Sequence, residues 1–238
     1  MRAVPRRAPG RGQPPPALCL GFWSATLTAL CAVGFTLAFG YHAATAPVAG
    51  EWQGMEAFTA TFSAWRMALV LVPSLVLAPA FVTMLACVHS VAPEEVRAWS
   101  RVGLALAIIY AVVACVNYTV QLVVVRGNLL GPEAGALGLL VMGNPRSLFW
   151  GLAILCYNFF MGPAAAFAAE TLGGGPLPAL IRRLFTVNAA ASVAGGIVYF
   201  VTLDHLHPAG LVSTAVWCIV LPLASGLLAA HFRRLAAA

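Results

Sequence analysis

The chain has 238 residues, of which 61% are apolar and only 8% are charged, and its mean hydropathy is +0.91. A water-soluble domain of this composition would expose a very large apolar surface, so the composition excludes a soluble fold. The net charge of +6 would suggest nucleic acid as the partner of a soluble protein, but membrane topology explains these arginines. We therefore expect an all-α, polytopic membrane helix bundle that is surrounded by membrane lipids and has no nucleic-acid partner.

Residues 1–16 hold four arginines and five prolines, which is typical of a disordered basic tail. Residues 17–238 are expected to form a single six-helix domain. Its first apolar run, 17–41, resembles a signal peptide because basic residues precede it and small residues follow at 44–46. The run exceeds the roughly 7–15 residues of a signal-peptide core, so we interpret it as a retained helix.

Five further apolar runs follow, and each is close to the roughly 20 residues that a membrane-spanning helix needs. They cover residues 67–89, 102–125, 148–171, 186–203 and 210–230. Between the first two spans, aromatic residues and a methionine recur at helical spacing, namely Trp52, Met55, Phe58, Phe62 and Trp65. This segment is either an amphipathic helix in the membrane interface or a loop folded over the mouth of the bundle.

Arginine placement predicts the orientation, since the cytoplasmic flanks of membrane helices are enriched in Lys and Arg. With six spans, ten of the thirteen arginines fall on the side of the termini, and Arg66, Arg126 and Arg146 fall on the other side. We therefore expect both termini in the cytoplasm and a multi-pass protein of the inner (plasma) membrane.

Proline recurs near the middle of alternate spans, as Pro79, Pro163 and Pro222. These three helices are expected to be kinked, with neighbouring groups or water satisfying the freed carbonyls. The chain also contains a weak internal repeat, in which four residues recur at a constant offset: Trp65, Pro93, Arg97 and Val102 match Trp150, Pro178, Arg182 and Val187. This repeat reflects either a duplicated helical hairpin, as in some transporters, or chance.

The densest group of polar side chains inside a long apolar run lies at residues 116–122, VNYTVQL. On a helical wheel, Tyr110, Asn117 and Gln121 share a narrow arc, and Tyr118 lies beside it. In hydrocarbon these groups are costly unless they are paired. This face is therefore predicted to point into the bundle.

The fourth span offers a matching pair, Tyr157 and Asn158, at the same expected depth as Asn117. The six candidate residues have two interpretations: an uncharged contact that holds the third and fourth spans together, or a pocket for a solute or a lipid headgroup. The first favours a non-enzymatic membrane component. The second favours a small uncharged-solute transporter or channel, in which the mid-span prolines act as hinges.

Enzymatic function has little support in the sequence. Paired carboxylates, HExxH, GxSxG and a phosphate-binding loop are all missing from the sequence. There is no lysine, which excludes retinal and pyridoxal cofactors because both bind through a lysine amine. The six cysteines lie in or beside predicted spans without a CxxC pair, which favours buried apolar side chains over disulfides or metal ligands. We expect no cofactor.

Asp204, His205 and His207 are the candidates for a metal site, because imidazole and carboxylate groups bind zinc and copper. Nothing in the sequence fixes a further ligand. The other interpretations of this segment are a solvated external loop and a pH sensor.

The fifth span carries small residues at spacings that let helices approach closely, with Ala191 before Gly195 and Ser192 before Gly196. This face is expected to be buried against a neighbour. The neighbour is either another helix of the chain or a partner, such as a second copy in a homo-oligomer.

Three segments carry a resemblance to known sequences: 116–122 (VNYTVQL), 144–150 (NPRSLFW) and 181–188 (IRRLFTVN). As a set they resemble the matching parts of a family of uncharacterised bacterial six-helix integral membrane proteins, over residues 65–200. The family has no assigned activity, so the resemblance implies the topology and no function.

Overall fold

The computed structural model describes residues 15–45, 52–129, 131 and 134–237, and contains helices and turns but no strand within them. In this part of the chain, six helical segments are long and apolar enough to cross a membrane: Pro16–Thr45, Ala64–Val91, Glu94–Asn128, Leu148–Ala169, Pro176–Thr202 and Pro208–Ala237. The predicted all-α bundle with six spans is thus confirmed. Most of the predicted basic tail, residues 1–14, lies outside the described residues.

Four spans are single α-helices: α1 (Pro16–Thr45), α3 (Ala64–Val91), α8 (Pro176–Thr202) and α9 (Pro208–Ala237). The third span begins with the 3-10 turn η1 (Glu94–Val96) and continues through α4 (Arg97–Thr119), the π-helical turn η2 (Val120–Val125) and α5 (Arg126–Asn128). The fourth span consists of α6 (Leu148–Leu155), a second π-helical turn η4 (Cys156–Met161) and α7 (Gly162–Ala169). Two of the six spans are therefore widened near the polar residues.

Several helices extend beyond their predicted bounds. The largest difference is in α8, which begins at Pro176 rather than at residue 186. Arg182 and Arg183 end the apolar run in the sequence, but they lie in the first turns of the helix, where charged side chains reach the membrane surface. Pro176 suits this start, since the first helical position needs no backbone N–H donor.

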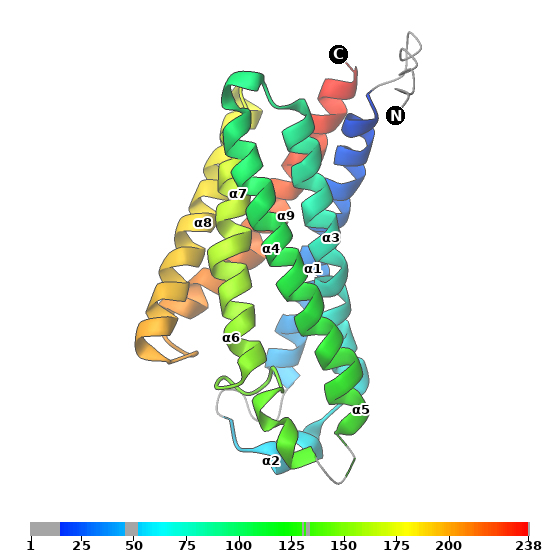
Figure 1. Cartoon of the computed structure of the whole chain (residues 1–238), viewed down its shortest axis with the longest axis vertical. Coiled ribbons are helices and arrows are strands. Elements are labelled where there is room, and N and C mark those ends of the chain that lie inside the picture. The colour runs from blue at the N-terminus through cyan, green and yellow to red at the C-terminus, as the bar shows by residue number, and fades with distance from the viewer. Residues whose placement is uncertain (1–14, 46–51, 130, 132–133, 238) are drawn as a thin grey trace, which may run out of the picture.

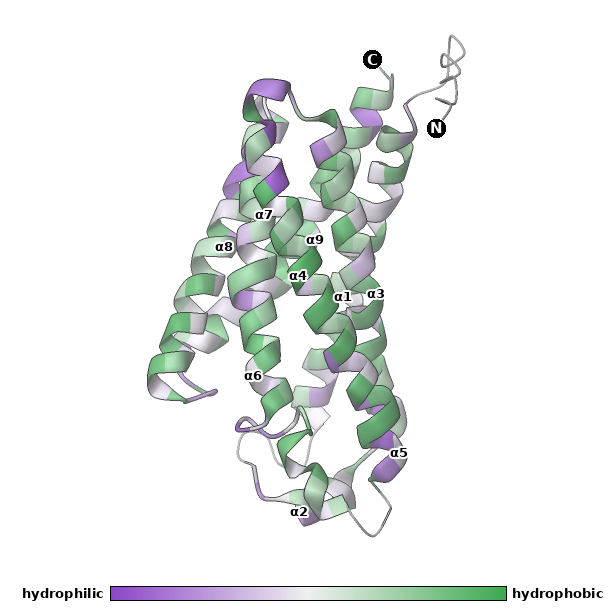
Figure 2. Ribbon diagram, viewed as in Figure 1, coloured by the Kyte–Doolittle hydropathy of each residue, from purple (hydrophilic) through white to green (hydrophobic). Residues whose placement is uncertain are grey.

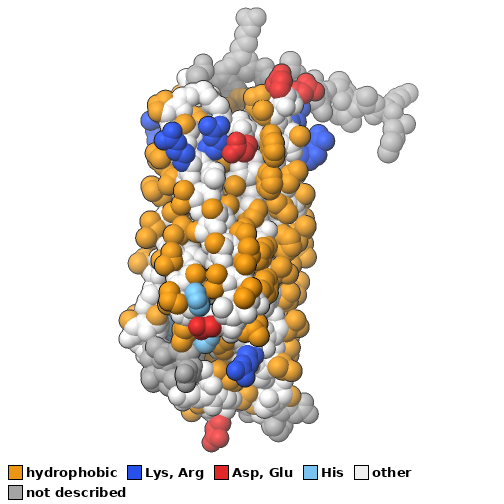
Figure 3. Space-filling view, turned by 90° about the vertical axis from the view of Figure 1, so that its left-hand side faces the viewer, with side chains coloured by type: hydrophobic (Ala, Val, Ile, Leu, Met, Phe, Trp, Pro, Cys, Tyr) orange, Lys and Arg blue, Asp and Glu red, His pale blue; other side chains and the backbone are white. Residues whose placement is uncertain are grey.

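Helices that follow one another in the chain pack side by side, and α9 returns to α1, so the spans close into a ring in the order α1, α3, α4, α7, α8, α9. α1 begins and α9 ends at the same end of the bundle (Figure 1). Apolar residues run along the helices, and hydrophilic residues gather towards the helix ends and turns (Figure 2). On the face in Figure 3, arginine side chains flank a broad apolar belt. This distribution matches a protein that crosses a bilayer.

The centre of the bundle contains a connected chain of aromatic rings. Phe35 of α1 packs edge-on against Trp217 of α9, with ring centroids 5.1 Å apart, and Trp217 packs in the same way against Tyr157 of η4, at 5.5 Å. Tyr157 contacts Tyr110 of α4 at 5.4 Å, and Tyr110 contacts Phe81 of α3 at 5.6 Å. These edge-to-face contacts favour a defined packing beyond simple burial. They join five elements of the ring through its interior.

The small-residue face of α8 packs within the chain. A Cβ added at Gly195 would lie 2.5 Å from the Ser213 side chain of α9, and one added at Gly196 would lie 2.6 Å from the Phe159 ring of η4. Ser192 lies against Gly162 at the start of α7. The predicted burial is thus observed, and the neighbours of this face are α7, η4 and α9.

Residues 52–62 and 134–142 form a cap at the end of the bundle opposite the start of α1 (Figure 1). Helix α2 (Met55–Thr61) packs against the 3-10 helix η3 (Ala134–Leu139). A second small core joins them, made of Val125, Leu129, Leu137 and Val141 with Trp52, Met55, Phe58 and Phe62 packed around it. Trp52, Met55, Phe58 and Phe62 therefore point into this cap, whereas Trp65 belongs to α3 and is 54% exposed. The segment combines features of both predicted alternatives, because it contains a short helix, α2, and folds over the end of the bundle.

All six cysteines are free, and Cys31, Cys87 and Cys156 are buried in the apolar core. The mid-span prolines lie inside α3 and α9 and at the start of α7, as the sequence places them. Pro163 is the second residue of α7, which begins at Gly162 after η4 ends at Met161. Proline has no N–H to donate to the carbonyl four residues earlier, and its ring crowds that carbonyl, so a widened turn relieves the conflict.

Candidate functional site

Gln121 connects the third span to the cap. Its Nε2 donates to the Leu140 carbonyl at 2.7 Å, and its Oε1 accepts a hydrogen bond from the Met142 backbone N–H at 2.9 Å. The side chain is 1% exposed and sits in η2. Both ends of the amide are therefore occupied by the backbone of one loop segment, which they fix against the helix.

Asn117 connects the third span to the fourth. Its Nδ2 donates to the Phe149 carbonyl in the first turn of α6 at 2.9 Å. Its Oδ1 is buried without a hydrogen-bond partner among the described residues. Asn117 thus holds α6 with one end of its amide and leaves one acceptor unused, one helical turn from Gln121.

Two tyrosines form the second direct bond between these spans. The hydroxyls of Tyr118 and Tyr157 lie 2.6 Å apart, and either one can donate. Tyr110 packs edge-on against Tyr157, yet its own hydroxyl has no hydrogen-bond partner within the described part of the chain. Tyr110 and Tyr118 are 0% and 1% exposed and Tyr157 is partly buried, so two of the three phenols are fully enclosed in the bundle.

Asn158 turns away from Asn117. Its Nδ2 donates to the Ile154 carbonyl of its own helix at 3.0 Å, and its Oδ1 accepts from the Ser213 hydroxyl of α9 at 3.4 Å. The structure therefore brings together five of the six predicted residues, which we call the polar cluster: Tyr110, Asn117, Tyr118, Gln121 and Tyr157. Asn158 belongs to the contact between η4 and α9.

The loop before α6 is ordered by residues outside the predicted site. Asn144 donates to the Gly138 carbonyl at 2.7 Å and accepts from the Arg146 N–H at 3.0 Å. Ser147 caps α6, accepting from the Trp150 N–H at 3.0 Å, and Tyr199 of α8 donates to the Pro145 carbonyl at 2.8 Å. A serine directly before an apolar helix is a signal by which Ser147 can be found in the sequence, whereas Tyr199 lies in an apolar run with no sign of its distant acceptor.

The candidate metal ligands take part in local contacts. Asp204 accepts a hydrogen bond from the Leu206 N–H at 2.9 Å, and His207 Nδ1 accepts from the Ala209 N–H at 3.2 Å near the start of α9. His205 packs edge-on against Trp150, with ring centroids 6.0 Å apart. Within the described residues, no group of three or more His, Cys, Asp or Glu side chains is placed to hold a metal ion.

The fold and the polar cluster together define a multi-pass α-helical membrane protein with an uncharged, hydrogen-bonded centre. The chain matches no family model, no curated protein and no solved structure. The amides and phenols of the polar cluster can form hydrogen bonds, but they supply neither a charge nor a strong nucleophile.

Proposed function

We propose that the protein is a non-enzymatic membrane component in which the polar cluster holds the third span, the fourth span and the cap in one arrangement. The observation that carries this proposal is the pair of hydrogen bonds between the Gln121 side chain and the backbone at Leu140 and Met142. The two part-buried backbone groups that Gln121 satisfies would otherwise lack this partner beside its fully buried side chain. Tyr110, Asn117, Tyr118 and Gln121 are at most 1% exposed, so they serve contacts inside the protein.

The proposed orientation places both termini in the cytoplasm and the cap outside, in a plasma membrane. Arginine distribution supports it. Within the described residues, Arg97, Arg101, Arg182, Arg183, Arg233 and Arg234 lie near the end where α1 begins, and Arg66, Arg126 and Arg146 lie near the cap. Cytoplasmic flanks carry the arginine excess. A cysteine-accessibility experiment with a single introduced cysteine in the cap tests this orientation.

Single leucine substitutions test the structural role of the cluster. Among these substitutions, we expect Gln121→Leu to lower the thermal unfolding temperature in detergent most. It leaves two backbone groups without a hydrogen-bond partner, which costs about 1–3 kcal/mol of stability each. Asn117→Leu removes one hydrogen bond to the Phe149 carbonyl and should have the second largest effect. Asn158→Leu should have the smallest effect, because that amide bonds mainly to its own helix. Asn128→Leu is the control, since its side chain is exposed and, among the described residues, bonds to the Val124 carbonyl of its own helical turn alone.

A small uncharged-solute transporter is the second candidate. Three buried polar atoms near the centre have no partner among the described residues: Asn117 Oδ1, the Tyr110 hydroxyl and Trp217 Nε1. π-Helical turns, of which two flank this region, are frequent at functional sites. Uptake of small polar solutes into proteoliposomes separates the two proposals. If Asn117→Leu keeps full thermal stability and abolishes an uptake that the wild type shows, the structural proposal is wrong.

A further inference from the structure

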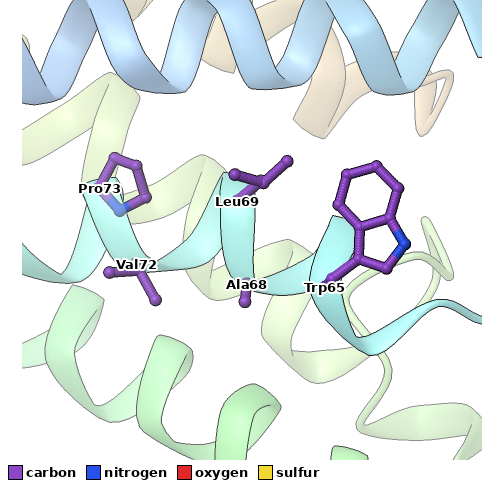
Figure 4. A pocket seen from close by; sticks show the side chains of 5 residues that line it. All are labelled: Trp65, Ala68, Leu69, Val72 and Pro73. Carbon is purple, nitrogen blue, oxygen red and sulfur yellow. The ribbon is translucent and has the colours of Figure 1, made fainter.

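A recessed apolar strip runs along α3 where this helix is flanked by α1 and α4 (Figure 4). The groove has a volume of about 420 Å³ and is lined by Trp65, Ala68, Leu69, Val72 and Pro73. Trp65, Leu69 and Val72 are 54%, 46% and 45% exposed, so the strip opens outward from the bundle. In a spanning helix, that direction is the lipid.

The dimensions of the groove fit an acyl chain that lies along the helix. From Trp65 to Pro73 the helix rises about 12 Å at 1.5 Å per residue. One leaflet contributes about 15 Å of hydrocarbon, half of the roughly 30 Å core. Because Trp65 lies in the first turn of α3, the groove begins at the level of the helix ends and runs towards the middle of the bilayer.

A cation stands at the outer end of the groove. The Arg66 guanidinium lies 5.6 Å from the Trp65 ring centroid and 5.8 Å from the ring centroid of Tyr41 on α1. These two rings are themselves 6.0 Å apart and hold the guanidinium at the mouth. The one ion pair among the described residues joins Arg182 and Glu170 at the other end of the bundle. Arg66 therefore has no acidic partner within the described part of the chain.

We propose that this groove binds one anionic phospholipid, with an acyl chain against Ala68, Val72 and Pro73 and its phosphate at Arg66. A guanidinium binds phosphate oxygens with two parallel hydrogen bonds, and the aromatic rings lie at the depth where Trp and Tyr are favoured in membranes. The site is separate from the polar cluster and does not depend on the function proposed for it.

Native mass spectrometry of the full chain, released from detergent, tests the site with dioleoyl phosphatidylglycerol as the probe. Arg66→Gln removes the charge and should reduce retention of one bound lipid about fivefold, the effect of one arginine near an anionic lipid. Ala68→Phe fills the groove and should give a loss of similar size. Val72→Phe is a second filling variant if Ala68→Phe does not fold.

Two matched controls separate the groove from the general membrane surface. Arg126→Gln removes another arginine at the same end of the bundle, and Val212→Phe enlarges a side chain of α9 that is 60% exposed and lies outside the groove. Both should retain the lipid as the wild type does. Equal losses in the controls and in the groove variants would overturn the proposal.

The headgroup is tested with two further probes. Dioleoyl phosphatidylcholine should be retained less than phosphatidylglycerol, and Arg66→Gln should narrow that difference, because the arginine favours net negative charge. Glycerol phosphate, which has the phosphate and no acyl chain, should not bind. Tight binding of glycerol phosphate, or equal retention of both lipids by the wild type, would contradict an anionic phospholipid as the occupant.

Discussion

The two halves of the third span are held to their neighbours in different ways. Near its start, Gly103 lies so close to α7 that an added Cβ would be 2.7 Å from the Ala164 carbonyl oxygen and 2.8 Å from the Ala168 nitrogen. Near its end, Asn117 and Gln121 reach across to backbone groups of α6 and of the cap loop. One half is held by contact between backbones and the other by long polar side chains.

The difference follows from what lies opposite each half. Lipid provides no hydrophobic force that drives helices together, so they associate through close packing and through hydrogen bonds. Close packing suffices where two regular helices meet over small residues, as at Gly103. At the other end, the partners are the first turn of α6 and an irregular loop, whose backbone groups accept and donate hydrogen bonds that polar side chains supply. The π-helical turn η2 widens the helix at Gln121, where that reach is needed.

Of the changes that test this comparison, Gly103→Val should have the largest effect on stability. Its new side chain meets backbone atoms of α7, which cannot move aside as a flexible side chain can, and overpacking typically costs about 1–3 kcal/mol or more. We expect a large drop in the thermal unfolding temperature in detergent, followed by loss of a monodisperse peak in gel filtration. Gly226→Ala is the control, since a Cβ at Gly226 in α9 would have no atom within 4 Å. If the Gly103→Val protein were as stable as the control, close packing at Gly103 could not be what holds this half of the span to α7.

Ser147→Ala should have an intermediate effect that is confined to the start of α6. The change removes the acceptor for the Trp150 N–H, and loss of a helix cap costs about 1 kcal/mol. Hydrogen exchange should increase at the Trp150 amide, with a modest loss of thermal stability. Ser63→Ala is a matched control because Ser63 occupies the same position before α3 but its side chain makes no cap hydrogen bond. Similar losses in both variants would show that the cap bond does not explain the effect.

The sequence predicted the six spans well because a bilayer demands long apolar runs, and it predicted the inward direction of Tyr110, Asn117 and Gln121 because they share one helical face. It did not reveal the partners of Gln121. These are backbone atoms of Leu140 and Met142, and backbone acceptors leave no mark on residue type. The π-helical turns were missed for a related reason. No proline lies in η2, and the contacts of its Gln121 and Val125 with the cap are not visible in the sequence.

Asn158 shows how far depth alone can mislead. Depth in the membrane placed it level with Asn117, but the rotation of η4 about its axis directs it to Ser213 of α9. The rotation depends on the widened turn, which a helical wheel with 3.6 residues per turn does not contain. Tyr157, one residue earlier, therefore became the partner of the third span.

The smallest predicted effect is the coupling between the Tyr118 and Tyr157 hydroxyls, which lie 2.6 Å apart. A cycle of Tyr118→Phe, Tyr157→Phe and the double variant should give a coupling of about 0.6 kcal/mol, the mean for hydrogen bonds between membrane helices. Each single variant strands one hydroxyl, whereas the double variant leaves an apolar pair, so it should be more stable than the sum of the single losses predicts.

Tyr110→Phe is the control for this cycle, because the Tyr110 hydroxyl is buried without a partner among the described residues. Removing it should leave stability unchanged or raise it slightly, since no bond is lost. Zero coupling between Tyr118 and Tyr157, measured by reversible unfolding in detergent, would show that the phenol pair adds nothing to the contact. The half of the third span next to the cap would then depend on its amides alone, and Gln121 would be the residue that holds the cap.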